Sequence, residues 1–281
     1  MVQGALAVKK WPRKPSLRWA SRSKAIMLSI FRKRNLSKNS PQVSCSSAVF
    51  LESCPANNKS GYKSIDAVYA NSLNAMDAQQ VELAMKQHAL LIDTRGQEQY
   101  RQAHIKGSWF IGLNGQFAPW AGALITDMHQ PIVIIADEGK EQEAIMRLAR
   151  VGYDNVLGYL SGGVEAWKSA GKATVNIPSI SPEDFAAQGV GSAKVLDVRK
   201  PSEFEESHLI NADNVPLDFF SELIQNLDMR NTYAVHCKGG YRSMIAASIL
   251  EANGANGVID MMGGFDKIRL TNAPVTAAAQ V

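Results

Sequence analysis

Short apolar runs alternate along this chain with segments whose apolar residues recur at helical spacing. Each run is continuous and only a few residues long, as in strands buried on both faces of a parallel sheet. The runs predict strands near residues 90–92, 109–111, 131–136, 195–196, 233–235 and 258–259, and the segments predict helices near 77–86, 97–102, 117–124, 141–151, 219–227 and 244–251. This alternation predicts an α/β fold in which mainly parallel sheets are flanked by helices.

Polar residues mark two helix starts. Asp77 is a candidate N-cap for the helix predicted over 77–86. Ser181 is a candidate N-cap for a further helix, because Pro182 falls in the first turn and two acidic residues follow it.

The two halves of this pattern are copies of one another. The matched segments, in chain order, are 91–95 with 195–199, 104–105 with 208–209, 134–137 with 235–237 and 160–163 with 261–264. Landmarks that recur in the same order indicate an internal repeat. We therefore predict two domains of one fold, residues 61–173 and residues 177–277, joined by a short linker.

The first 60 residues differ from the rest of the chain in charge. Residues 1–51 hold 11 Lys or Arg and no Asp or Glu, whereas the other residues hold 19 basic residues against all 26 acidic ones. No helical or strand period runs through this basic leader, residues 1–60, so we expect it to be disordered. Three alternatives stay open: an organelle transit peptide, a tail that binds nucleic acid, and a segment translated from a shifted reading frame.

One loop concentrates the reactive residues. The strand predicted at 233–235 leads to Cys237, Arg242 follows five positions later, and a predicted helix comes next. Helix N-termini collect unpaired N–H groups and a partial positive charge, which stabilise a thiolate and bind anions. The carboxyl ends of parallel strands are also where such sheets bind ligands. We predict that Cys237 is a nucleophile.

Several motifs together resemble the rhodanese family of sulfurtransferases. They are Asp-x-Arg at 197–199, Phe-x-x-x-His at 204–208, Cys-x-x-Gly-x-Arg-Ser at 237–243 and the Gly-Gly pair at 263–264. The likeness covers about residues 75–275 and implies two tandem rhodanese-like domains. The pair is also similar to the C-terminal half of proteins in which a metallo-β-lactamase-type persulfide dioxygenase is fused to two rhodanese domains, without that metal domain.

The resemblance implies an enzyme that transfers sulfur through a persulfide on Cys237. Sulfane sulfur would come from thiosulfate or a low-molecular-weight persulfide and pass to a thiol or to cyanide. Asp197 and Arg199 would support the loop, and we expect Arg242 to pair with an acid such as Asp197. The loop residues expected to surround the sulfur or its anionic donor are Lys238, Gly239, Gly240, Tyr241, Arg242 and Ser243.

The first copy departs from this pattern at the residue that matters most. The repeat places Asp137 where the second copy has its cysteine, and further acidic residues follow it. A carboxylate cannot carry sulfane sulfur, and its charge would repel thiosulfate or a thiolate. We therefore predict that domain 61–173 is degenerate and non-catalytic, and that domain 177–277 is catalytic.

Two rival functions remain. The chain could be a non-enzymatic sulfur carrier, or a docking module for a separate persulfide dioxygenase, which would then be its protein partner. A phosphatase of the arsenate-reductase type is less favoured, because binding four oxygens typically needs a longer Cys-x-x-x-x-x-Arg loop. The spacing from Cys237 to Arg242 is one residue shorter, which suits a single sulfur atom.

The remaining composition narrows the partners. The five histidines are scattered without a ligand run, so we predict no metal and no cofactor. No apolar run approaches the roughly 18 residues that a membrane span needs, and the acidic body argues against nucleic acid as the main partner. Three cysteines make no disulfide framework, and a working thiolate suits a reducing cytoplasm. The expected partners are a small-molecule sulfur donor and a thiol acceptor.

Overall fold

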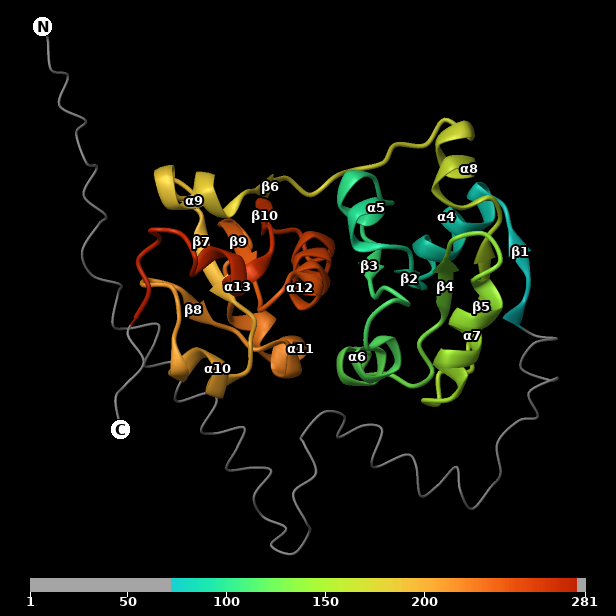
Figure 1. The fold of residues 1–281 in the computed structure, drawn as a ribbon. Coiled ribbons are helices and arrows are strands. Elements are labelled where there is room, and N and C mark those ends of the chain that lie inside the picture. Colours follow the sequence, from blue (N-terminus) through green and yellow to red (C-terminus); the bar gives the residue numbers. More distant parts are fainter. Residues whose placement is uncertain (1–71, 277–281) are drawn as a thin grey trace, which may run out of the picture. The chain divides into compact units, whose positions relative to one another are not determined.

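The computed structural model describes residues 72–276, all of which belong to one compact unit of the chain. They form two α/β domains, as predicted (Figure 1). The predictions for the leader, residues 1–60, lie outside the described residues. The elements of the first domain are β1 (Ala75–Met76), α4 (Ala78–Lys86), β2 (Leu90–Asp93), α5 (Gln97–Gln102), β3 (Trp109–Phe110), α6 (Phe117–Leu124), β4 (Ile132–Ile135), α7 (Glu141–Ala149), β5 (Val156–Leu160) and α8 (Gly163–Ser169).

The second domain repeats the same succession of strands and helices, with short helical turns where the first has α6. Its elements are β6 (Ser179–Ile180), α9 (Pro182–Gln188), β7 (Lys194–Asp197), α10 (Pro201–Glu206), β8 (Asp213–Asn214), η1 (Leu217–Phe219), α11 (Phe220–Leu223), η2 (Ile224–Asn226), β9 (Thr232–His236), α12 (Tyr241–Ala252), β10 (Gly257–Met261) and α13 (Gly264–Ile268).

Each domain contains one five-stranded sheet, and both sheets have the same strand order. The order is β1-β5-β4-β2-β3 in the first domain and β6-β10-β9-β7-β8 in the second. Every pairing within both sheets is parallel. The central strands β4 and β9 therefore end at the same edge of their sheets, which positions the loops that follow them.

Helix capping explains why the predicted starts hold. The Asp77 carboxylate accepts the N–H groups of Gln79 and Gln80 at 2.8 Å, so α4 begins at the residue after the predicted cap. The Ser181 hydroxyl accepts the N–H of Asp184 at 3.0 Å, with Pro182 in the first turn of α9.

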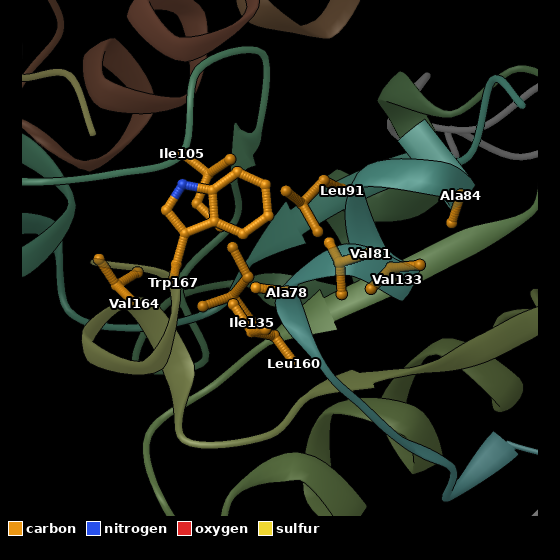
Figure 2. Packing of buried hydrophobic residues seen from close by; sticks show 10 residues of the cluster. All are labelled: Ala78, Val81, Ala84, Leu91, Ile105, Val133, Ile135, Leu160, Val164 and Trp167. Atoms are coloured by element: carbon orange, nitrogen blue, oxygen red, sulfur yellow. The ribbon is translucent and has the colours of Figure 1, made fainter. Parts of the chain in front are cut away.

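The sheets are covered on both faces. In the first domain, α4 and α8 cover one face of the sheet, where Trp167 packs on a cluster of aliphatic side chains (Figure 2). Val133 and Ile135 of β4 belong to this cluster, whereas Ile132 and Ile134, also fully buried, alternate to the other face. This explains why β4 is apolar at every position. In the second domain α9 and α13 build the corresponding cluster.

One predicted helix changes type along its length. Residues 217–226 are helical, as predicted for 219–227, but they form η1, α11 and η2 in succession and not one regular α-helix. The buried residues of this segment are Leu217, Phe219, Phe220, Leu223 and Ile224. Within residues 72–276 no helix is long and apolar enough to cross a membrane.

Candidate active site

Cys237 lies directly after the central strand β9, at its carboxyl end. Its side chain is 2% exposed, and the backbone N–H of Gly240 points to Sγ at 3.1 Å. Gly240 has φ +114°, a conformation that favours glycine, and α12 begins at the next residue. The thiol therefore sits in a tight turn between a strand end and the N-terminus of a 12-residue helix, as predicted.

The backbone of the loop is held from the other side by α13. The Cys237 carbonyl accepts the N–H of Phe265 at 2.7 Å, and the Lys238 carbonyl accepts the N–H of Asp266 at 3.1 Å. Gly264 makes this approach possible: a Cβ there would lie 2.6 Å from both loop carbonyl oxygens, and its φ is +61°. The second glycine of the Gly-Gly motif is therefore required for the shape of the active loop.

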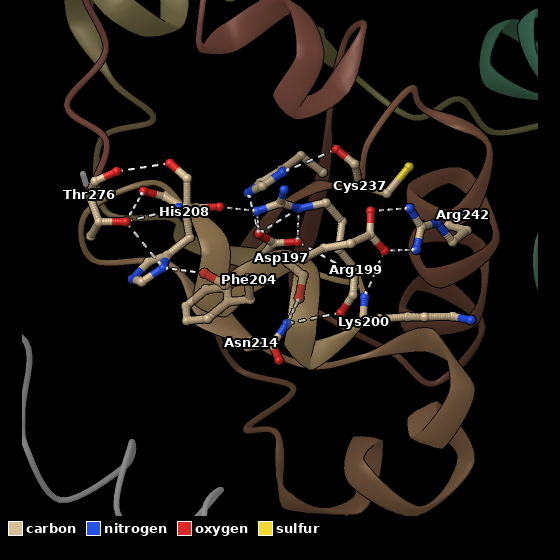
Figure 3. A network of polar contacts seen from close by, with 12 residues as sticks. Asp197, Arg199, Lys200, Phe204, His208, Asn214, Cys237, Arg242 and Thr276 are labelled. Atoms are coloured by element: carbon tan, nitrogen blue, oxygen red, sulfur yellow. Dashed lines mark hydrogen bonds and ion pairs between the residues drawn. The ribbon is translucent and has the colours of Figure 1, made fainter. Parts of the chain in front are cut away.

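Arg242 closes the loop and is held by Glu203 of α10. Two hydrogen bonds join them, from Nη1 to Oε2 at 2.7 Å and from Nη2 to Oε1 at 3.0 Å. Burial would raise the pKa of Glu203, but the hydrogen bonds and charge of Arg242, the Lys200 N–H and the charge of Arg199 together outweigh it, and the pKa lies below the ordinary value. Figure 3 shows the Arg242–Glu203 pair in the same view as the Cys237 thiol.

The expected pairing of Arg242 with Asp197 is wrong. Arg199, two residues along the chain, binds both Asp197 carboxylate oxygens at 2.6–3.0 Å, and its Nη2 also reaches the Ser207 carbonyl (Figure 3). The guanidinium of Arg199 lies over the Phe265 ring at 4.0 Å. Asp197 is thus already paired locally, and Glu203 takes the second arginine.

The Asp-x-Arg pair supports the fold of both domains. In the first domain Arg95 binds Asp93 with the same atoms, and its Nη2 reaches the Ala103 carbonyl at 2.8 Å. Desolvation by burial raises the pKa of Asp93 despite the arginine beside it. Since the pair is present in the copy without the cysteine, its presence does not depend on the thiol, and the loop support expected of Asp197 and Arg199 stays a prediction.

The other predicted loop residues have different surroundings. Lys238 and Gly239 are exposed, at the open side of the loop. Ser243 is buried, and its hydroxyl donates to the Gly240 carbonyl at 2.7 Å. Tyr241 points away from the sulfur atom and donates its hydroxyl to the Gly112 carbonyl at 2.7 Å. Only some of the predicted residues therefore face the thiol.

The histidines near this region have structural surroundings. His208 stacks on Phe204 at 3.6 Å, and its Nδ1 lies 2.7 Å from the Phe204 carbonyl. His104 repeats this arrangement on Tyr100 in the first domain. His236 is fully buried beneath the loop, 3.8 Å from Asp197, and desolvation lowers its pKa, which favours the neutral ring.

Strand pairing corrects the alignment of the two loops. Asp93 pairs with Ile135 in the first sheet and Asp197 pairs with His236 in the second, so Ile135 and His236 are equivalent. The residue after each is Ala136 or Cys237, and Ala136 therefore takes the place of the cysteine. The sequence comparison had placed Asp137 there. Asp137 is instead the counterpart of Lys238.

In the corrected alignment, the loops of the two domains carry opposite charges, although both have a glycine with positive φ at the same position. Gly139 and Gly240 both have positive φ, at +78° and +114°, just before the helix that follows each loop. Lys238 is replaced by Asp137 and Arg242 by Glu141. These two acids line a cavity of about 620 Å³ beside the Gly162-Gly163 turn.

Glu203 is a site residue that sequence reasoning missed. Its counterpart in the first domain is Gln99, which makes the same backbone cap: Gln99 Oε1 accepts the Gly96 N–H, and Glu203 Oε2 accepts the Lys200 N–H. The Gln99 amide donates to Asp137 at 2.9 Å. The sequence repeat contained a signal for this pair, since the glutamate and the arginine are both absent from the first copy.

Within residues 72–276 no three His, Cys, Asp or Glu side chains gather in a way that could hold a metal ion.

Comparisons with known proteins agree with this description. Residues 77–170 and 182–271 each match the model of the rhodanese-like domain. The thiosulfate sulfurtransferase GlpE of Pseudomonas entomophila is 32% identical over 98 residues, which are 35% of this chain and 90% of that protein. The uncharacterized protein YqhL of Bacillus subtilis is 33% identical over 89 residues, 32% of this chain and 70% of that protein. The putative sulfur carrier protein YrkF of Bacillus subtilis is 30% identical over 92 residues, 32% of this chain and 50% of that protein.

Proposed function

Because this chain belongs to the rhodanese-like domain family, we propose that its second domain is a sulfurtransferase whose nucleophile is Cys237. The donor is thiosulfate or a low-molecular-weight persulfide, and the acceptor is a thiol or cyanide. The observation that carries the proposal is the position of the Cys237 sulfur, at the end of β9 with the Gly240 N–H directed at it. A relative named thiosulfate sulfurtransferase supports the choice of donor.

The reaction balances without a cofactor. The Cys237 thiolate attacks the outer sulfur of thiosulfate, the S–S bond of thiosulfate breaks, and sulfite leaves with the electron pair of that bond. The enzyme then carries Cys-S-S⁻. Cyanide attacks the outer sulfur to give thiocyanate, or a thiolate attacks it to give a new persulfide, and either step restores the Cys237 thiolate.

The charges of the loop suit anionic reactants. Lys238 is exposed at the mouth, where a cation steers a dianion toward the thiol. Arg242 is fixed beside the thiol by Glu203 and supplies a second positive group. The Gly240 N–H is placed to stabilise negative charge on Sγ, which is a thiolate before the attack on the donor and again after the sulfur has been passed on. Lys238, Arg242 and Gly240 thus have separate roles in the proposed reaction.

A sulfur carrier is the second candidate. The burial of Cys237 favours it, because a 2% exposed sulfur shields a persulfide from most acceptors. The relative named putative sulfur carrier supports the same alternative. A carrier would take up sulfur once and release it only to a particular protein, such as a persulfide dioxygenase.

Mass spectrometry of the full chain tests the proposal. After exposure to thiosulfate or to glutathione persulfide, the peptide containing Cys237 should gain one sulfur atom. Peptide mapping is needed because Cys45 and Cys54 are also thiols. The Cys237→Ser variant should show no gain, and a Cys45→Ser/Cys54→Ser variant should gain sulfur like the unmodified chain.

Turnover separates the two candidates. Repeated release of thiocyanate when thiosulfate and cyanide are both in excess supports the enzyme. One equivalent of bound sulfur without further turnover supports the carrier. Absence of any sulfur on Cys237 with both donors would refute both, and hydrolysis of a phosphate ester by the same chain would favour the phosphatase alternative.

A further inference from the structure

The active loop is attached to the domain that lacks the cysteine. Tyr241 lies between Cys237 and Arg242 in the sequence, but its side chain does not face the thiol. It leaves the second domain and contacts the first. Its hydroxyl donates to the Gly112 carbonyl at 2.7 Å, and its ring meets the edge of Phe110 at 5.7 Å between centroids. Burial raises the pKa of this hydroxyl, which keeps it protonated and able to donate.

Gly115 forms the socket for the ring. Any Cβ at Gly115 would collide with the ring carbons of Tyr241. The backbone of Gly115 has no positive φ that would itself require glycine. The missing side chain is therefore needed for space, and that space is filled by a residue of the active loop. The Gly112 carbonyl accepts the Gly115 N–H at 3.2 Å as well, which fixes the turn that receives the hydroxyl.

The same edge strand also contacts α12 farther from the loop. β3 is an edge strand of the first sheet, so the outward N–H of Phe110 has no neighbouring strand. The buried hydroxyl of Ser248 on α12 accepts this N–H at 2.9 Å. Near the end of α12, Glu251 lies 3.8 Å from the buried His104. The first domain thus contacts α12 from its first residue to its last turn.

We propose that the first domain, although it has lost the sulfur-carrying residue, acts as a brace that holds the sulfur-transfer loop, with Tyr241 as the positioning residue. Tyr241 stands one residue after Gly240, whose N–H points to the thiol. Holding the Tyr241 ring in the first domain fixes the turn of the loop. This turn directs the Gly240 N–H at Sγ and buries Sγ. A repeat without its own cysteine keeps a function because the reactive loop of the other repeat rests on it.

The inference rests on the proposed role of Cys237 as the reacting thiol, but its test does not require sulfur transfer. Alkylation of Cys237 by iodoacetamide, followed on its own peptide over a range of pH, measures the exposure and ionisation of this sulfur. Tyr241→Phe removes only the hydroxyl, and Gly115→Ala fills the socket from the other domain. Ser248→Ala is the matched control, because it breaks a contact of the same interface away from the loop.

The proposed brace predicts that the rate of alkylation and the rate of sulfur uptake change in opposite directions. Both loop variants should alkylate faster, by about fivefold for the loss of one hydrogen bond, because the loop opens more often, and the pH midpoint of alkylation should move. Sulfur uptake from thiosulfate should slow by a similar factor, because the Gly240 N–H is less well aimed. Ser248→Ala should change neither alkylation nor its pH midpoint.

The outcomes separate the two proposals. If both loop variants alkylate like the unmodified chain and like Ser248→Ala at every pH, the brace is refuted. If all three variants alkylate faster alike with an unchanged midpoint, general loosening explains the result and the brace is again refuted. Faster alkylation in the loop variants alone, in a chain that takes up no sulfur, supports the brace while refuting the proposed function.

Discussion

The substitution Gly264→Ala tests whether α13 shapes the active loop. A methyl group at this position has two costs. The residue has φ +61°, where an L-residue costs about 1–2 kcal/mol relative to glycine. The new Cβ would also lie 2.6 Å from the Cys237 and Lys238 carbonyl oxygens, and overpacking of this kind costs about 1–3 kcal/mol more. The expected loss of unfolding free energy is about 2–5 kcal/mol.

The first domain provides a matched control. Gly163 occupies the equivalent position with φ +58°, but a Cβ there would come no closer than 3.6 Å to the Ala136 carbonyl oxygen. Gly163→Ala should therefore lose only the conformational part, about 1–2 kcal/mol. The difference between the two variants isolates the contact with the active loop. Sulfur uptake should fall by about tenfold to a hundredfold in Gly264→Ala alone, because the loop is displaced.

The two domains can be followed separately in one urea titration. Trp109, Trp120 and Trp167 lie in the first domain and no tryptophan lies in residues 177–277, so tryptophan fluorescence reports on the first domain once Trp11 and Trp19 are replaced by phenylalanine. Labelling of the buried Cys237 thiol reports on the second. Separate probes are needed because multi-domain chains often unfold in more than one step. Equal losses in the two variants, with sulfur uptake unchanged in Gly264→Ala, would refute the argument.

Three further predictions concern charge. Glu203→Gln should weaken thiosulfate binding, seen as a higher KM, because it frees the guanidinium of Arg242; the loss should vanish in a background where Arg242→Ala is already present, and persistence there would contradict the pairing. Ala136→Cys in a Cys237→Ser background should take up sulfur from thiosulfate at least tenfold more slowly than the unmodified chain, by roughly the cost of surrounding acids, measured by peptide mass; equal rates would show that the thiol alone suffices. Burial raises the pKa of Asp260 to about 6, so the folded state holds this proton more tightly than the unfolded state and stability falls as pH rises from about 4 to 6. Asp260→Asn should then unfold at higher urea near neutral pH, by roughly 3 kcal/mol at most, and match the unmodified chain below about pH 4; a gain that is independent of pH would exclude this cause.

Helix starts and long apolar strands could be predicted from the sequence because local chemistry determines them. The capping residue of α4 and the continuous apolar run of β4 are examples. The edge strands β1, β6 and β8 were missed, since two residues give no period, and β5 was missed although it has five residues. Helix α10 was missed for another reason: it has no buried residue, so no apolar spacing marks it.

The position of the cysteine in the candidate site could be predicted from the sequence, but the partner of Arg242 and the counterpart of the cysteine in the first copy could not. Cys237 could be placed at a strand end because the apolar run before it and the helix after it are both local signals. The partner of Arg242 could not, since Glu203 is 39 residues away and the nearer motif acid is already bound by Arg199. The residue opposite the cysteine in the first copy was misplaced by one, because neither Ala136 nor Asp137 resembles a cysteine and only strand pairing fixes the register.

The two copies in one chain separate scaffold from chemistry. Features present in both, such as the Asp-x-Arg pair and the histidine stacked on an aromatic ring, are needed by the fold whether or not a cysteine is there. Features confined to the second copy are the ones to which the proposed reaction assigns roles, and they change as a set. The thiol, the loop cations Lys238 and Arg242, and the glutamate that fixes one of them are all replaced in the first copy. The backbone cap itself does not need the charge of Glu203, because Gln99 makes the same cap in the first copy. The charge of Glu203 is therefore best assigned to Arg242, which it binds with both oxygens, and this links the ion pair to the proposed sulfur chemistry.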